Sequence, residues 1–375
     1  MHYTLHLTNA CNLQCHYCYV HKQKPKHMTA ETARAVVDRA AVPGGSVGLS
    51  FFGGEPLLCK GLIFETVAYA KAVGEEKGCT FHFKLTTNGT LIDDDFLQFC
   101  SENRVMIALS LDGAQAAHDA HRIFADGAGS YASVEAAAKR LLEYQPYACA
   151  MMVVNPDTVG LYADGVQQLH DLGFKYYICS LNYDKEAVWT DAHMEELERQ
   201  FSLLADMYIE WTLAEEKFYF SPFEVKMRSH IDGERYCEQR CQLGIKQLSV
   251  DTDGQLYPCV QFVGEDQYSV GDVFGGIDES RRMQLFHKAE ETAGVCADCA
   301  IQARCNHHCG CLNKQATGDI KGISPVLCAH ERLALAAADR TAETLFAAGS
   351  RLFLQKQYND MYPLISLIED KTCAS

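Results

Sequence analysis

The chain of 375 residues lacks the features of a membrane or exported protein. It has no apolar run near the roughly 20 residues that a transmembrane helix needs. Its first ten residues, MHYTLHLTNA, have neither the basic segment nor the apolar core of an export signal. The sequence therefore predicts a cytoplasmic protein with no membrane contact.

Positive charge is also scarce. The chain has 33 basic against 49 acidic residues, a formal net charge of -16. A protein that follows a nucleic-acid backbone needs clustered lysine and arginine to neutralise phosphates. Nucleic acid is therefore not expected as a substrate. The hydrophobic content of 48% is that of a globular protein, and the length allows more than one domain.

Cysteine, by contrast, is abundant, with 18 residues. Cytoplasmic thiols stay reduced, so clustered cysteines there indicate metal sites rather than disulfides. One group comprises Cys11, Cys15 and Cys18, and a second comprises Cys237, Cys241, Cys259, Cys296, Cys299, Cys305, Cys309, Cys311 and Cys328. The other six are scattered, and for them we expect the role of small buried hydrophobic residues: Cys59, Cys79, Cys100, Cys149, Cys179 and Cys373.

Residues 1–185 alternate between short β-rich runs and helical segments. The predicted strands are 3–8, 46–52, 79–86, 105–111, 148–154 and 175–181. Repeated strand–helix–strand units predict right-handed crossovers and a parallel sheet. Six such units fit an incomplete barrel as well as an open sheet.

The segments that follow the first four strands are rich in cysteine, glycine, asparagine and aspartate. The first cysteine group follows the first strand, and GGEP (53–56), TTNG (86–89) and SLDG (110–113) end the next three. The carboxyl ends of parallel strands line the ligand site in barrels and open sheets. We therefore expect these four segments to share one site.

The regular alternation stops after residue 185. Residues 186–236 read as a helical bridge, 237–330 as a small cysteine-rich domain, and 331–375 as a helical tail. Within the cysteine-rich region, a hairpin is predicted to turn at Asp253 and Gly254. Asp251 and Asp253 are expected to belong to this turn and not to a calcium loop, because the remaining calcium ligands are missing.

The first cysteine group has the spacing C-x3-C-x2-C, one thiol short of a complete site. Structural zinc sites and ferredoxin-type clusters use four protein ligands. Three cysteines can hold three irons of a cubane cluster and leave the fourth iron open to a substrate or cofactor. The spacing, with Tyr17 before the last cysteine, resembles the radical S-adenosylmethionine (radical SAM) superfamily.

This resemblance implies a partial (β/α)6 barrel of the TIM type. It also implies a [4Fe-4S] cluster whose open iron binds S-adenosylmethionine, and a 5′-deoxyadenosyl radical that takes a hydrogen atom from a substrate C–H bond. By the same resemblance, seven residues from the strand-end segments would contact S-adenosylmethionine: Gly53, Gly54, Glu55, Asn88, Ser110, Arg122 and Leu181.

The second cysteine group resembles the SPASM extension of radical enzymes that modify peptides and proteins. The resemblance implies two auxiliary [4Fe-4S] clusters, three in all. The first would use Cys241, Cys259 and Cys309, with Cys237 as a candidate fourth ligand whose binding the sequence leaves open, and the second Cys296, Cys299, Cys305 and Cys328. Cys311 is surplus to this pattern, and His307 and His308 are expected to cover a cluster. Taken alone, the CxxC pairs would also fit zinc ribbons.

Two classes of relative compete for the substrate. Anaerobic sulfatase-maturating enzymes, which oxidise a Ser or Cys of a client protein to formylglycine, carry an Asp base after the YPC cysteine, where this chain has Val260. The stretch YPCVQFVG with GDVF looks more like maturases that cross-link cysteine-rich precursor peptides. We therefore expect a peptide maturase that is reduced by a flavodoxin or ferredoxin. Tyr19, His82 and Asp112 are substrate-site candidates that the sequence does not rank.

An alternative of another class is an iron–sulfur electron carrier without catalysis. Such a carrier would fill each cluster with cysteines and would not need GGEP beside an open iron.

Overall fold

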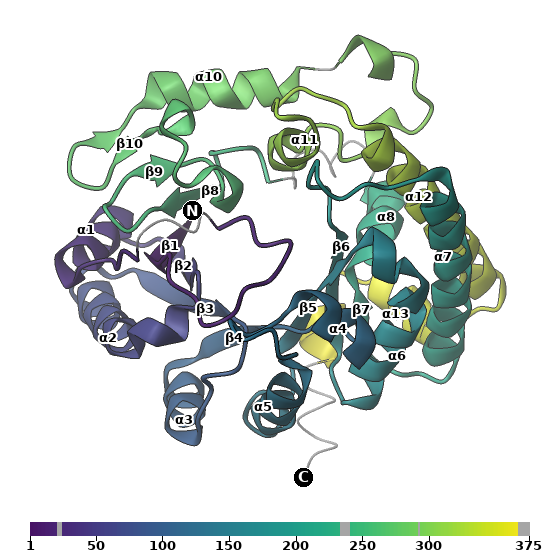
Figure 1. Cartoon of the computed structure of the whole chain (residues 1–375), viewed down its shortest axis with the longest axis horizontal. Coiled ribbons are helices and arrows are strands. Elements are labelled where there is room, and N and C mark those ends of the chain that lie inside the picture. The colour runs from purple at the N-terminus through teal and green to yellow at the C-terminus, as the bar shows by residue number, and fades with distance from the viewer. Residues whose placement is uncertain (21–24, 233–240, 292, 367–375) are drawn as a thin grey trace.

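A nine-stranded sheet organises the chain, in the order β7-β6-β5-β4-β3-β2-β1-β8-β9 (Figure 1). The computed structural model describes residues 1–20, 25–232, 241–291 and 293–366. Each of the six predicted strands is present, and they pair in parallel in chain order. They are β1 (His2–Thr8), β2 (Ser46–Gly53), β3 (Thr80–Thr87), β4 (Val105–Ser110), β5 (Cys149–Val154) and β6 (Tyr176–Leu181).

The crossover helices cover the outer, convex side of the curved sheet (Figure 1). They are α1 (Ala30–Ala40), α2 (Lys60–Lys77), α3 (Asp94–Asn103), α5 (Tyr131–Tyr144) and α6 (Tyr162–Asp171). Because the strands are ordered consecutively, right-handed crossovers place every helix on the same face. This decides between the two architectures that the sequence allowed: the sheet is a partial barrel, with helices outside.

Local sequence signals fix the ends of these helices. Thr29 precedes α1, and its side chain accepts a hydrogen bond from the backbone N–H of Thr32. Asp93 caps α3 in the same way through the N–H of Phe96. Gly78 ends α2 in the left-handed region, at φ 64°, where a glycine has no Cβ penalty. The chain therefore encodes the crossover lengths that bring the strands into register.

The sheet does not end with the sixth strand. Short β7 (Tyr219–Phe220) adds to β6, and β8 (Gln247–Val250) pairs in parallel with β1. Strand β9 (Leu256–Tyr257) returns antiparallel to β8, and Gly254 takes φ 92° in the turn, so the predicted hairpin is confirmed. The beginning of the cysteine-rich region is thus joined to the barrel by backbone hydrogen bonds.

Short elements complete the part of the chain that the structure describes. The remaining small strands and helices are α4 (Gln115–His121), β10 (Gly271–Asp272), β11 (Gly276–Ile277), α10 (Glu279–Glu290) and α11 (Gly310–Thr317). The 3-10 turns are η1 (Pro56–Cys59), η2 (Pro156–Leu161), η3 (Val260–Phe262), η4 (Asp266–Tyr268), η5 (Gly294–Cys296) and η6 (Gln302–Arg304). None of the helices within the described ranges is long and apolar enough to span a membrane.

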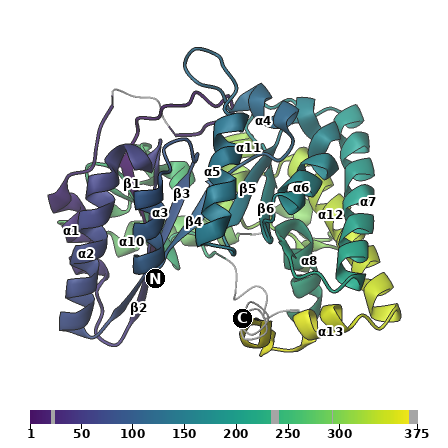
Figure 2. The same ribbon diagram turned by 90° about the horizontal axis from the view of Figure 1, so that it is seen from below.

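A layer of four helices lies beyond β6 (Figures 1 and 2). It contains α7 (Asp191–Leu213), α8 (Ser221–Asp232), α12 (Pro325–Ala347) and α13 (Arg351–Tyr358). Helix α12 packs against both α7 and α8, and α8 packs against β6. The C-terminal helices therefore brace the last strands of the barrel.

A buried ion pair joins two helices of this layer. Lys226 Nζ of α8 lies 2.5 Å from Glu331 Oε2 of α12, and both side chains are almost fully buried. Glu331 also accepts hydrogen bonds from the backbone N–H (3.0 Å) and side-chain amide (3.2 Å) of Asn306, which follows Cys305. Burial acts to raise the pKa of Glu331, but Lys226 and the hydrogen bonds outweigh it and leave that pKa lowered.

Glu331→Ala is expected to lower the free energy of unfolding by about 3–5 kcal/mol, because it leaves the Lys226 ammonium buried without its partner. Urea unfolding followed by circular dichroism measures the loss. The matched control is Glu135→Ala, which removes one partner of the Lys139–Glu135 pair on the surface of α5. Its expected effect is within about 0.5 kcal/mol. Equal losses in the two variants would contradict the structural role of the buried pair.

Candidate functional site

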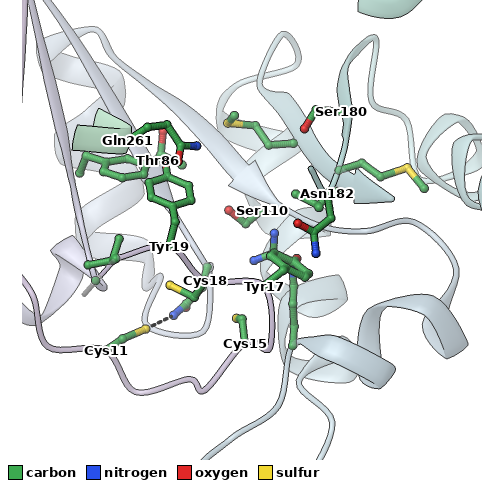
Figure 3. A pocket seen from close by; sticks show the side chains of 18 of the residues that line it. Cys11, Cys15, Tyr17, Cys18, Tyr19, Thr86, Ser110, Ser180, Asn182 and Gln261 are labelled. Carbon is green, nitrogen blue, oxygen red and sulfur yellow. Dashed lines mark hydrogen bonds between the residues drawn. The ribbon is translucent and has the colours of Figure 1, made fainter. Parts of the chain in front are cut away.

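A cavity of about 240 Å³ lies at the carboxyl ends of β1 to β6. Figure 3 shows the cysteine loop along one side of it and Ser110, Ser180 and Asn182 on another. Nine of the ten residues predicted for the first cluster and for S-adenosylmethionine line this one cavity: Cys11, Cys15, Cys18, Gly53, Gly54, Asn88, Ser110, Arg122 and Leu181. The parallel sheet thus brings the strand-end segments together, as the strand order requires.

The cysteine loop has little regular structure and is held by neighbouring loops. Backbone N–H groups of Gln14 and His16 donate to the carbonyls of Ile123 and His121, at 2.7 and 3.0 Å. The Asn12 side chain donates to Thr90 Oγ1 at 2.7 Å, beyond β3. The loop therefore takes its conformation from the barrel rather than from its own sequence.

The three thiols fit a sulfur-ligated cluster. Cys11 Sγ accepts hydrogen bonds from the Leu13 backbone N–H (3.4 Å) and from Asn88 Nδ2 (3.7 Å). Such donors stabilise a thiolate and tune iron–sulfur sites. Although part of Cys11 is accessible, the surrounding protein raises the pKa of its thiol to about 11 by burial, so metal binding must displace a proton.

The described residues do not form a binding site for a single metal ion. Among them, no group of three or more His, Cys, Asp or Glu side chains is placed to hold one ion. A zinc site needs all its sulfurs about 2.3 Å from a common point, whereas a cubane cluster spreads its thiolates over separate irons. The convergence of three thiols on one cavity is therefore compatible with a cluster.

The two glycines of GGEP allow close packing against the cysteine loop. A Cβ at Gly54 would lie 2.1 Å from the Ala10 carbonyl oxygen, and one at Gly53 would lie 2.3 Å from that of Thr8. Gly53 also has φ 131°, which other residues rarely adopt. A side chain at either position would push away the start of the cysteine loop.

Glu55 is the predicted contact residue that does not line the cavity. It is fully buried, and its carboxylate accepts hydrogen bonds from the Leu57 N–H, the Thr87 hydroxyl and the Asn88 N–H at 2.7–2.9 Å. Burial raises its pKa to about 6, against the effect of these donors. In the structure Glu55 ties the end of β2 to the end of β3, and its contact with S-adenosylmethionine stays a prediction.

Asp112 is the centre of a buried network beneath the cavity. Its Oδ2 accepts hydrogen bonds from Tyr17 Oη at 2.5 Å and from Arg122 Nε at 2.9 Å. Its Oδ1 accepts one from the backbone N–H of Val153 at 3.0 Å. The Arg122 guanidinium also lies over the Tyr17 ring, 5.2 Å from its centre. One carboxylate thus joins the cysteine loop to two strand ends and to Arg122.

The structure ranks the three open candidates. Tyr19 lines the cavity and stacks on Phe52, with ring centres 6.3 Å apart. Asp112 lies below the cavity in the network with Arg122. His82 is exposed on β3 and lines a separate cavity, so it is not part of this site.

Other lining residues were not predicted. They come mainly from β5, β6 and the cysteine-rich region: Tyr17, Val20, Phe52, Met151, Met152, Val153, Ile178, Ser180, Asn182, Gln261, Leu312 and Gln315. Thr86 and Thr87 also line the cavity, as expected for the TTNG segment. The ends of β5 and β6 could have been found by extending the strand-end argument to the last two strands. The three residues from η3 and α11 could not, because only the packing of the second cysteine region places them here.

The second cysteine group divides in space. Burial and the nearby sulfurs of Cys259 and Cys309 raise the pKa of Cys241 to about 12. Cys328 lies close to Cys296 and Cys299, whose sulfurs add to burial in raising its pKa. The remaining predicted ligand of the second auxiliary cluster, Cys305, contacts Glu331. Cys237 lies outside the described residues.

The comparisons with known proteins point in one direction. The family model described as the Radical SAM superfamily matches residues 5–160. The Cysteine-type anaerobic sulfatase-maturating enzyme of Clostridium perfringens is 25% identical over 282 residues, which cover 71% of this chain and 75% of that protein. The Serine-type enzyme of Klebsiella aerogenes is 25% identical over 316 residues, 80% of this chain and 77% of that one.

Solved structures share the fold. Native anSMEcpe with bound AdoMet gives a TM-score of 0.79 at 21% identity, over 92% of this chain and 98% of that one. Streptococcus suis SuiB bound to precursor peptide SuiA gives a TM-score of 0.61 at 13% identity, over 87% and 75%. At these identities the likeness concerns the fold.

Asp112→Asn is expected to weaken S-adenosylmethionine binding at least tenfold, about 1.4 kcal/mol. The change leaves the buried Arg122 guanidinium without its charged partner and loosens Tyr17 of the cysteine loop. Anaerobic equilibrium dialysis of cluster-loaded protein measures the affinity. The control is Asp126→Asn, whose carboxylate accepts a hydrogen bond from the Ala128 N–H in an exposed turn. Unchanged affinity in Asp112→Asn, with full iron content, would show that the network does not support the site.

Proposed function

We propose that this chain, a radical SAM enzyme that acts on a peptide or protein, forms a cross-link at a cysteine of its peptide substrate. Its cofactors include a [4Fe-4S] cluster and S-adenosylmethionine. Two auxiliary clusters in the second cysteine group, three clusters in total, and reduction by a flavodoxin or ferredoxin complete the proposal. Its reduced thiols suit the cytoplasm.

One observation carries the choice of substrate: the described cavity lining has no carboxylate, imidazole or amine that would act as a general base. Of the described residues that line it, none is an aspartate, glutamate, histidine or lysine, and the one charged side chain among them is Arg122, an obligate cation. Oxidation of a serine hydroxyl to an aldehyde requires removal of the O–H proton by a base within hydrogen-bond reach. The lining does not supply that base.

Val260 occupies the position of the relatives' aspartate and does not compensate. It packs against the core and lines a smaller cavity of about 40 Å³, while its neighbour Gln261 faces the catalytic cavity. Gln261 has an amide, which neither gains nor loses a proton near neutral pH. The segment after Cys259 therefore contributes polarity to the cavity and no base.

A cysteine substrate suits such a cavity. A free thiol has a pKa near 8.5, so its proton leaves without a strong base, whereas a serine hydroxyl holds its proton much more firmly. Formation of a thioether removes one hydrogen from carbon and one from sulfur and keeps the sulfur in the product. The resemblance of YPCVQFVG to peptide maturases supports this product over an aldehyde.

The chain's own residues set the conditions for this chemistry. When bound, the cluster and S-adenosylmethionine would supply the one-electron chemistry that removes a hydrogen atom from an unactivated carbon. Cys11, Cys15 and Cys18 would hold that cluster, and Asn88 would donate to the sulfur of Cys11. Met151, Ile178 and Leu312 give the cavity an apolar wall that limits water near the reacting groups.

Formylglycine formation from cysteine is the second candidate. The 25% identity with the Clostridium perfringens Cysteine-type enzyme over 282 residues favours it, and native anSMEcpe has been solved with bound AdoMet and the Kp18Cys peptide. This product also starts from a thiol, but the sulfur is lost. The two candidates thus share a substrate class and differ in the fate of the sulfur.

The carrier without catalysis is set aside, because the radical SAM match and the sulfatase-maturating relatives indicate an enzyme. A cavity beside three thiols also serves no purpose in a protein that only stores or passes electrons.

Wild-type protein reconstituted anaerobically is expected to hold about twelve irons per chain, and Cys11→Ala/Cys15→Ala/Cys18→Ala about eight, since each [4Fe-4S] cluster contributes four. The triple variant should also make no 5′-deoxyadenosine. Iron analysis measures the iron content, and chromatography measures 5′-deoxyadenosine. Retention of all twelve irons in the triple variant would remove the first cysteine group from the cluster site.

The peptide test uses a synthetic cysteine-rich peptide, with dithionite and S-adenosylmethionine, and measures accurate mass together with free thiols. The expected product has lost two hydrogens and one free thiol and has kept its sulfur. A matched peptide with serine in place of each cysteine should react at least tenfold more slowly, a barrier about 1.4 kcal/mol higher. A synthetic sulfatase-type peptide with a target cysteine is run in parallel.

Each outcome decides between the candidates. Loss of sulfur with gain of an aldehyde in the sulfatase-type peptide would replace cross-linking by formylglycine formation. Equal rates for the serine and cysteine peptides would overturn the argument from the cavity lining. Loss of hydrogens with all thiols still free would move the product to a carbon–carbon link.

A further inference from the structure

Cys311, which has no part in the SPASM-like spacing, lies among the predicted ligands of the first auxiliary cluster. Its thiol makes hydrogen bonds with the sulfurs of Cys259 and Cys309, and it is buried, with 8% of its surface exposed. Cys241 lies close to the same two sulfurs. Four thiols from three separate segments therefore meet at one place.

The start of α11 explains how Cys309 and Cys311 point the same way. Cys309 is the N-cap residue of this helix, and Cys311 follows two positions later in its first turn. The Cys311 thiol and the backbone N–H groups of Leu312 and Cys311 donate to the Cys309 sulfur, and together they outweigh burial and lower the pKa of Cys309. Free N–H groups at a helix N-terminus favour a thiolate there.

Cys259 reaches this helix from the opposite side. It is buried directly before η3, and η3 packs against α11. Gln261 of η3 and Leu312 of α11 line the catalytic cavity, so the two thiols next to them lie just behind its wall. Tyr19 lies near thiols of both cysteine groups, because the sulfurs of Cys259, Cys18 and Cys311 all act on its hydroxyl.

We propose that Cys311 is the fourth protein ligand of the first auxiliary cluster, together with Cys241, Cys259 and Cys309. This rests on the proposed function, which places a cluster at that site. A [4Fe-4S] cluster that passes electrons takes four cysteine thiolates, and the described residues supply four. Cys311 is a buried thiol beside two of these sulfurs, so it is within reach of the same cluster.

The assignment has a mechanistic consequence. With Cys311 bound, every iron of this cluster has a protein ligand, without Cys237. The cluster then offers no open iron to a substrate thiol, so the substrate cysteine must react inside the cavity, on the other side of the wall formed by Gln261 and Leu312. The role of this auxiliary cluster is then to move electrons past Tyr19 to or from the catalytic site.

The test measures iron and sulfide per chain, with electron paramagnetic resonance of the reduced protein, in three variants. Cys311→Ala should lose about four of twelve irons, one [4Fe-4S] cluster. Cys237→Ala should keep them all. Cys100→Ala, which removes a fully buried thiol from α3, is the matched control and should also keep them all.

A second variant separates ligation from packing. Cys311→Ser offers an oxygen ligand of similar size, and we expect it to hold the cluster with a changed resonance signal. Binding of S-adenosylmethionine should stay unchanged in both Cys311 variants, which shows that the barrel is intact. Full iron content and an unchanged signal in Cys311→Ala, or loss of iron in Cys237→Ala, would overturn the assignment.

The outcomes also separate this inference from the proposed function. Wild-type protein with only four irons would remove the auxiliary clusters and with them both proposals. Iron losses as expected, with no cross-linked peptide product, would leave Cys311 as a ligand and reject the proposed reaction alone.

Discussion

The buried carboxylate of Asp112 is the interaction on which the site depends. The cysteine loop has little regular structure, so the barrel must supply its conformation. Asp112, just beyond β4, holds Tyr17 of that loop, Arg122 beyond α4 and the backbone of β5 at Val153. Burial lowers the pKa of Arg122, but Asp112 more than offsets this and raises it, so the pair stays charged. A charge pair without water has few alternative geometries, and this fixes the loop.

The second constraint is the continuation of the sheet into the cysteine-rich region. Because β8 pairs with β1, the hairpin that leads to Cys259 starts beside the strand that leads to Cys11. Thiols of the two cysteine groups, far apart in sequence, thus lie near the same Tyr19 hydroxyl. Gln261 and Leu312, close in sequence to Cys259 and Cys311, line the same cavity as the cysteine loop.

The side chains that line the cavity are the basis for the proposed chemistry. Among the described residues, the cavity is lined by apolar, hydroxyl, thiol and amide side chains, and Arg122 is the charged one. Such a lining suits a substrate that brings its own acidic proton, as a thiol does. Glu55 is the carboxylate nearest in sequence to the site. The three hydrogen bonds that it accepts join the end of β2 to the end of β3. The burial of Glu55 shows that a polar residue of a strand-end motif can stabilise the scaffold.

The six strands and the meeting of the strand-end segments beside Cys11, Cys15 and Cys18 could be predicted from the sequence, because strand period and parallel pairing follow local or nearly local rules. The family resemblance added the individual contact residues. Tertiary packing alone places Gln261 and Leu312 at the cavity, turns Glu55 into the core and brings Cys311 to Cys259 and Cys309. These depend on contacts between segments tens to hundreds of residues apart, and no short-range pattern encodes such contacts.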